Sequence, residues 1–134
     1  MFYNCSSLKK IYLSSFDTRN ITSMRPMFEG WSSLKLMDLS AFNSEKATNM
    51  SFMLAFCSSL KSLDLSSFNM NKFTDMSRML ADCWNLTSLY LSSFNTKNEN
   101  DMWWMLHDYS SLKKDNIKIN NNDNNILNAI NESI

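Results

Sequence analysis

Glycine and proline are almost missing from this sequence, with one residue of each among 134. A globular domain built from many tight turns needs more of both, whereas a repetitive chain can turn its corners with Ser, Thr, Asn and Asp. An excess of one charge is missing as well, because thirteen basic residues balance thirteen acidic ones. Since no net field would attract the chain to a polyanion, we expect no nucleic-acid partner.

Long hydrophobic runs are also missing. One of the longest, 52–57, has six residues, whereas a membrane span needs about 18, and we therefore expect no transmembrane segment. The N-terminus has no charged leader followed by an apolar stretch, and Cys5 does not follow the residues of a lipobox. With no signal peptide and no lipobox in the sequence, a cytoplasmic location stays open.

Groups that could carry out catalysis are few. The sequence has one histidine, His107, and no glycine-rich phosphate loop. No combination of nucleophile, base and orienting group is recognisable. We therefore expect no catalytic residues, no cofactor and no enzymatic activity.

What the sequence does contain is a period of 26 residues. It is clearest in two sets of equivalent positions: Met1, Met27, Met53, Met79 and Met105, and Leu8, Leu34, Leu60, Leu86 and Leu112. A fixed period of about 20 to 50 residues indicates stacked units that bury their apolar faces against one another. We expect four repeats and a partial fifth over 1–114, followed by an Asn-rich tail over 115–134.

One segment of each copy predicts a short strand. Leu60, Leu63 and Leu65 fit the L-x-x-L-x-L pattern of a leucine-rich repeat. The equivalent triplets in the other copies are 11–13, 37–39 and 89–91. Stacked copies would align these segments as a parallel sheet. In the partial fifth copy Ile117 and Ile119 come two places late, which predicts a frayed or slipped strand.

A second segment of each copy has helical spacing. Met76, Met79, Leu80 and Cys83 stand at i, i+3, i+4 and i+7, the spacing of one helix face. A good N-cap residue precedes this segment in each copy: Ser23, Asn49, Asp75 and Asp101. The sequence therefore predicts an α/β solenoid, a right-handed leucine-rich-repeat coil with short parallel strands and short return helices. Apolar spacing in 126–134 predicts a capping helix in the tail, with disorder as the alternative.

The three cysteines share one column of the repeat. Cys5, Cys57 and Cys83 are replaced by Trp31 and Tyr109 in the other copies. A position that exchanges Cys for Trp and Tyr is an apolar socket, so we expect no metal site there. We expect buried free thiols, with a disulfide between Cys57 and Cys83 as the alternative.

The repeat carries a family resemblance over residues 1–112. Its consensus reads M-[FL]-x-x-C-S-S-L-x-x-L-D-L-S-S-F-N-x-x-x-x-T-x-M-S. This pattern resembles the BspA-like leucine-rich repeat of bacterial surface proteins and lipoproteins. The resemblance implies a non-enzymatic, adhesin-like protein at the cell surface that binds proteins of a host or of neighbouring cells.

The first candidate site is the column of outward positions on the predicted strands, on the concave face of the sheet. Its members are Tyr12, Asp38, Asp64 and Tyr90. We interpret the two carboxylates as acceptors for a basic group of a protein partner, flanked by aromatic anchors. Two alternatives stay open: Lys35, Lys61 and solvent could relieve the repulsion, or a cation could bridge the pair.

The second candidate site is aromatic and consists of Trp84, Trp103 and Trp104. Exposed tryptophans in a cluster indicate contact with another molecule. The alternative is that the tail, 115–134, folds back over them. Phe52, Arg78 and Trp104 occupy equivalent positions in three successive copies. This arrangement places Arg78 between the two rings and predicts a cation–π stack.

Taken together with the resemblance, which implies the cell-surface location, these observations favour a cell-surface protein-binding module that acts through the concave sheet face. Two alternatives are a fragment or scaffold segment of a longer repeat array without its own ligand, and an intracellular protein-interaction solenoid. The first copy lacks a cap in the sequence, which predicts end-to-end self-association through the N-terminal repeat.

Overall fold

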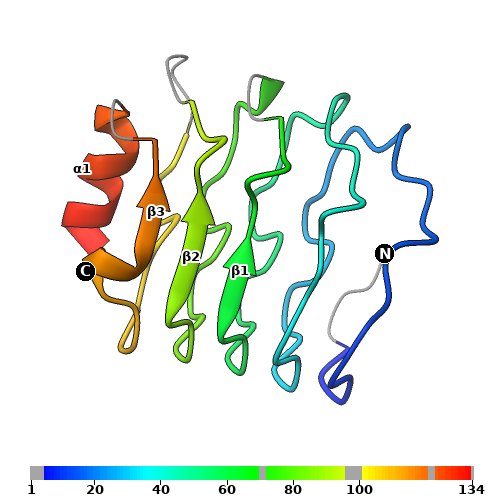
Figure 1. The fold of residues 1–134 in the computed structure, drawn as a ribbon, viewed down its shortest axis with the longest axis horizontal. Helices are drawn as coiled ribbons and strands as arrows, with labels where there is room; N and C mark the ends of the chain where they lie inside the picture. The colour runs from blue at the N-terminus through cyan, green and yellow to red at the C-terminus, as the bar shows by residue number, and fades with distance from the viewer. Residues whose placement is uncertain (1–4, 70–71, 96–100, 121–122, 134) are drawn as a thin grey trace.

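The computed structural model describes residues 5–69, 72–95, 101–120 and 123–133. Its elements are β1 (Ser62–Asp64), β2 (Ser88–Leu91), the 3-10 turn η2 (Lys114–Asn116), β3 (Ile117–Ile119) and helix α1 (Asn124–Ser133). Figure 1 shows the three strands side by side, with α1 beyond β3 at the C-terminal edge of the molecule. In the part of the chain so described, no helix has the length and apolar character that crossing a membrane requires.

The three strands form one parallel sheet in the order β1-β2-β3. Leu63 pairs with Leu89, so β1 and β2 are offset by one full period. Leu89 pairs in turn with Ile117, two places later than the period requires. The slipped register that the late isoleucines predict is therefore present, and η2 directly before β3 accommodates the extra residues.

The predicted fold class, a leucine-rich-repeat solenoid with a strand and a helix in every copy, is wrong. The described residues form a small three-stranded sheet and one helix, and most of the others lie in turns and irregular segments. Segment 11–13 is not a strand, and next to 37–39 there is only the isolated bridge between Leu36 and Ser62. Residues one period apart do lie beside one another, as the isolated bridges from Asn49 to Ser23 and to Asp75 show. These isolated bridges do not extend into strands.

The predicted return helices are absent for a reason that lies in the backbone. Phe52, Arg78 and Trp104 have φ angles of 57°, 52° and 55°. Left-handed residues of this kind cannot continue a right-handed helix. The N–H groups that a helix would use also bond elsewhere: that of Leu54 donates to the Met79 carbonyl at 3.0 Å, in the next turn of the chain, and not to Met50, the fourth residue back.

The helical spacing nevertheless identified buried residues correctly. Met50, Met53, Leu54 and Cys57 are all 0% exposed. Two successive tight turns direct them inward, beginning with the Met53 N–H donating to the Met50 carbonyl at 3.0 Å. The expected cap residues stabilise these turns, as when Asn49 Oδ1 accepts the Ser51 N–H at 2.9 Å. The spacing therefore predicts which side chains are buried, but it does not predict the backbone conformation at those positions.

All three cysteines are free, so the alternative of a disulfide between Cys57 and Cys83 is wrong. Both of these thiols donate to a backbone carbonyl oxygen 29 residues earlier, at 3.2 Å in each case. The hydroxyl of Tyr109 donates to the carbonyl at the same offset. This shared donor role explains why the column can exchange cysteine for tyrosine.

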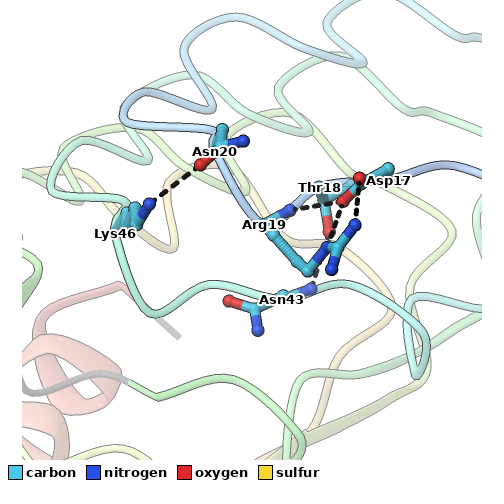
Figure 2. A network of polar contacts seen from close by, with 6 residues as sticks. All are labelled: Asp17, Thr18, Arg19, Asn20, Asn43 and Lys46. Atoms are coloured by element: carbon cyan, nitrogen blue, oxygen red, sulfur yellow. Dashed lines mark hydrogen bonds and ion pairs between the residues drawn. The ribbon is translucent and has the colours of Figure 1, made fainter.

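A network of polar contacts stabilises the corner formed by residues 17–20 (Figure 2). Arg19 bonds both carboxylate oxygens of Asp17, and its closest contact is 2.7 Å. Thr18 Oγ1 accepts the Asn43 N–H at 2.7 Å, one turn of the chain later. The hydrogen bonds from Arg19 lower the pKa of Asp17 to about 2. The corner therefore keeps its ion pair well into the acid range.

Candidate partner-binding surfaces

The structure brings the four outward residues of the first candidate site into one row. Tyr12 and Asp38 line one hollow of about 290 Å³, and Asp38 and Asp64 line a second of about 150 Å³. Asp64 is the register partner of Tyr90 across β1 and β2. All four side chains are exposed, Tyr12 at 73% and Tyr90 at 41%. The row therefore runs Tyr12, Asp38, Asp64, Tyr90.

Local turns hold the two carboxylates of the row. Asp38 Oδ1 accepts the Ser40 N–H at 2.9 Å. Asp64 Oδ1 accepts the Ser66 N–H at 2.8 Å and the Ser66 hydroxyl as well. The hydrogen bonds from Ser40 lower the pKa of the Asp38 carboxyl, which stays ionised at neutral pH. Each carboxylate thus keeps its Oδ2 outside the hydrogen bonds among the described residues.

Lys35 and Lys61 form no ion pair with the carboxylates of the row. Within the described ranges the ion pairs join Asp17 to Arg19 and His107 to Asp108. A lysine does approach the aromatic end, where Lys10 Nζ lies 4.7 Å from the ring centroid of Tyr12.

Sequence reasoning missed one member of this face, Leu36. Its side chain is 64% exposed, and it lines the same hollow as Tyr12 and Asp38. Its equivalents in other copies are the polar residues Lys10 and Ser62. An apolar residue at a position that other copies fill with polar residues was the signal that could have identified it.

In the second candidate site, the predicted cation–π stack of Arg78 is confirmed. Its guanidinium carbon lies 4.5 Å from the Trp104 ring centroid and 5.5 Å from that of Phe52. Trp103 and Trp104 stack on each other, with their ring centroids 4.1 Å apart. His107 stacks on Trp104 at 4.7 Å and extends the series.

Trp84 does not join this stack, although it is 51% exposed. It lines a separate hollow of about 380 Å³ with Asp108, Tyr109 and Ser110. The predicted patch of three tryptophans therefore consists of a stacked pair and one ring in a separate hollow. Asp108 and Tyr109 connect the two regions, because they also line the cleft beside the pair.

The tail does not cover the tryptophan pair. Trp103 and Trp104 are 58% and 42% exposed. They line a cleft of about 890 Å³ whose opposite wall is α1, through Asn125, Asn128 and Glu132. The tail therefore forms one side of an open cleft. Its buried face, with Ile126 at 0% and Ile130 at 5%, packs on the core instead.

A group that sequence reasoning did not anticipate lies at the edge of this cleft. Asp82, His107 and Asp108 each offer one ligand atom, and these atoms lie within 4.8 Å of one another. His107 Nδ1 is 3.2 Å from Asp108 Oδ2. An imidazole with two carboxylates could hold a divalent transition metal. The signal was the 26-residue spacing of Asp82 and Asp108, which places them side by side. His107 has no equivalent of its type in the other copies, and the helix predicted around it is absent.

The comparisons with known proteins give one match. Residues 1–122 match the family described as "Mycoplasma protein of unknown function, DUF285". This finding overturns the predicted membership of the BspA-like leucine-rich-repeat family. No curated protein and no solved structure matches the chain.

Proposed function

We propose that this chain, which belongs to the Mycoplasma family DUF285, is a non-enzymatic module that binds a basic segment of a protein partner through the row Tyr12, Asp38, Asp64, Tyr90. The observation that carries the proposal is the hollow that Asp38 and Asp64 line together. A cell-surface location depended on the BspA-like resemblance, and it stays a prediction.

The two carboxylates suit an arginine or lysine side chain of the partner. One oxygen of each is fixed by a turn, so the carboxylates are held in place before a partner arrives. Pre-organised acceptors cost less entropy on binding than mobile ones. A guanidinium can donate to both at once, and charge-assisted hydrogen bonds of this type are about twice as strong as neutral ones.

Exposed apolar side chains border the carboxylates and would supply the remaining contact area. Tyr12 and Leu36 flank Asp38, and Tyr90 pairs with Asp64. Tyrosine is enriched among the residues that dominate binding energy at interfaces. The combination favours a partner segment with a basic residue between apolar ones.

Peptides selected from a random displayed library on the wild-type chain would test this proposal. We expect enrichment of Arg and Lys, and at least a tenfold weaker affinity, about 1.4 kcal/mol, for the double variant Asp38→Asn with Asp64→Asn. Asparagine keeps the Oδ1 acceptor that each turn needs, so the fold should persist. The matched control, Glu45→Gln with Asp115→Asn, removes the same charge from exposed positions outside the row.

The two variants decide the outcome together. Loss of affinity in the first but not in the control supports binding at the row. Equal binding by the Asp38 and Asp64 double variant and the wild type would show that the row is not the site.

Self-association is a second candidate, and the exposure of the first copy favours it. Leu8 is 42% and Phe16 39% exposed, whereas their equivalents Leu34 and Phe42 are 0% and 5% exposed. The apolar side chains at the N-terminal face are therefore the ones that a second molecule could cover.

A further inference from the structure

The cleft between α1 and the tryptophan pair has a lining that restricts its ligand. On one side are Trp103, Trp104 and Asp108, and on the other Asn125, Asn128 and Glu132. Lysine and arginine are missing from the described residues that line it, whereas two carboxylates are present. The two carboxylates outnumber the one guanidinium at the aromatic wall, that of Arg78, so an anionic ligand is disfavoured.

A cationic ligand is also disfavoured at the aromatic wall. Arg78 already places its guanidinium 4.5 Å from the Trp104 ring and 5.1 Å from the Trp103 ring. The negative faces of the ring pair thus already attract one cation. A second would be repelled by the first. A purely apolar ligand would take water away from the exposed side chains of Asn128 and Glu132 without offering a hydrogen bond in return.

The polar wall comes from one face of α1. Asn125, Asn128 and Glu132 stand at i, i+3 and i+7, which places them along one side of the helix. The buried Ile126 and Ile130 occupy the other side. Side-chain amides donate and accept hydrogen bonds, and they therefore match hydroxyl groups, which also do both.

We propose that this cleft binds a neutral carbohydrate. A sugar ring presents an apolar C–H face that can lie on the indole of Trp103, which is 58% exposed. Its hydroxyls can exchange hydrogen bonds with Asn125, Asn128 and Glu132 on the helix and with Asp108 opposite them. Aromatic and amide groups on facing walls satisfy both sides of such a ring. The site is separate from the proposed protein-binding row.

An array of neutral, sialylated, sulfated and amino-sugar glycans, followed by titration of each bound glycan, would test this proposal. We expect neutral glycans to bind and to change the tryptophan fluorescence. Trp103→Ala and Asn128→Ala should each weaken binding at least tenfold. The matched control is Trp84→Ala, which removes an exposed tryptophan outside the cleft, and it should bind as the wild type does.

Several results would overturn the proposal. They are no neutral glycan bound at about 10 mM, well above weak binding, a preference for anionic or amino sugars, or wild-type affinity in Trp103→Ala. Trp103 and Asn128 are exposed, so these variants should fold, and circular dichroism checks that they do. The variant Asp38→Asn with Asp64→Asn should bind glycans normally, which distinguishes failure of this site from failure of the row.

Discussion

At the scale of single residues, the buried thiols show how strongly this interior excludes charge. Cys57 and Cys83 are 0% exposed, and each donates to a backbone carbonyl. Burial raises the pKa of Cys57 to about 12, and it raises the pKa of Cys83 as well. A thiolate at either position would be a charge buried among apolar side chains, which is unfavourable. Both residues therefore stay neutral, pack as small apolar side chains and donate one weak hydrogen bond each.

These pKa shifts predict that the protein loses stability in alkali. Above pH 9 the thiols of the unfolded chain ionise, while those of the folded chain stay neutral until about pH 12. The unfolded state is therefore favoured by up to about 1.4 kcal/mol per pH unit for each thiol. We expect the free energy of unfolding in urea to fall between pH 9 and 11, and to fall less in Cys57→Ala.

Thiol labelling provides a direct check of the same prediction. At pH 8 the half-buried Cys5 should react with a disulfide reagent, whereas Cys57 and Cys83 should react only after unfolding. Rapid labelling of all three in the native protein would contradict the burial on which the pH dependence rests.

At the scale of elements, the return leg of each copy is a pair of tight turns that uses left-handed residues. Gly30, the single glycine of the sequence, has φ of 78°. Its equivalents Phe56, Asp82 and Asp108 have φ of 61°, 60° and 57°. This region costs a residue with a Cβ about 1–2 kcal/mol, and it costs Asp less because Asp tolerates the conformation. The glycine therefore stands at a position where the turn uses a left-handed residue, and it is the residue that adopts this conformation at least cost.

This geometry predicts an order of stability for substitutions at Gly30. Gly30→Ala should lower the free energy of unfolding by about 1 kcal/mol or more, because alanine resists a positive φ. Gly30→Asp, which copies the residue of later turns, should cost clearly less. Urea denaturation of the two variants measures the difference. If the alanine variant were as stable as the aspartate variant, or more stable, the left-handed conformation at this position would be contradicted.

The return leg also shows what could be predicted from the sequence. The spacing of Met50, Met53, Leu54 and Cys57 identified the buried face correctly, because burial is set by which positions are apolar. It did not identify the backbone, because two tight turns and one helix can bury the same positions. Phe52 at positive φ could not have been anticipated, since phenylalanine carries no preference for that region.

The parts of the second candidate site also differ in how far the sequence could predict them. The stack of Arg78 on Phe52 and Trp104 followed from the 26-residue spacing, which places equivalent positions side by side. The cleft beside Trp104 did not, because its second wall is α1, outside the repeat. The orientation of a helix that follows 115–123 is decided by packing and not by local pattern, so no spacing in the sequence pointed to Asn128 facing a tryptophan.

At the scale of the whole molecule, the two ends differ. Helix α1 covers the C-terminal edge of the sheet, where it buries Ile126 and Ile130 (Figure 1). In the first copy, by contrast, Leu8 and Phe16 stay exposed. A contact between this exposed patch and the same patch of a second molecule joins two molecules and then stops, since a two-fold interface closes on itself.

The asymmetry therefore predicts a dimer and not a fibre. We expect sedimentation equilibrium to show a monomer–dimer equilibrium at concentrations of about 10–100 μM, typical of a weak interface. The variant Leu8→Ser with Phe16→Ser should be monomeric, because it removes the apolar groups that contact would bury. The matched control Leu36→Ser removes an exposed leucine from the sheet face and should dimerise as the wild type does. Open-ended assembly, or dimers that survive the Leu8 and Phe16 change, would show that molecules meet through another surface.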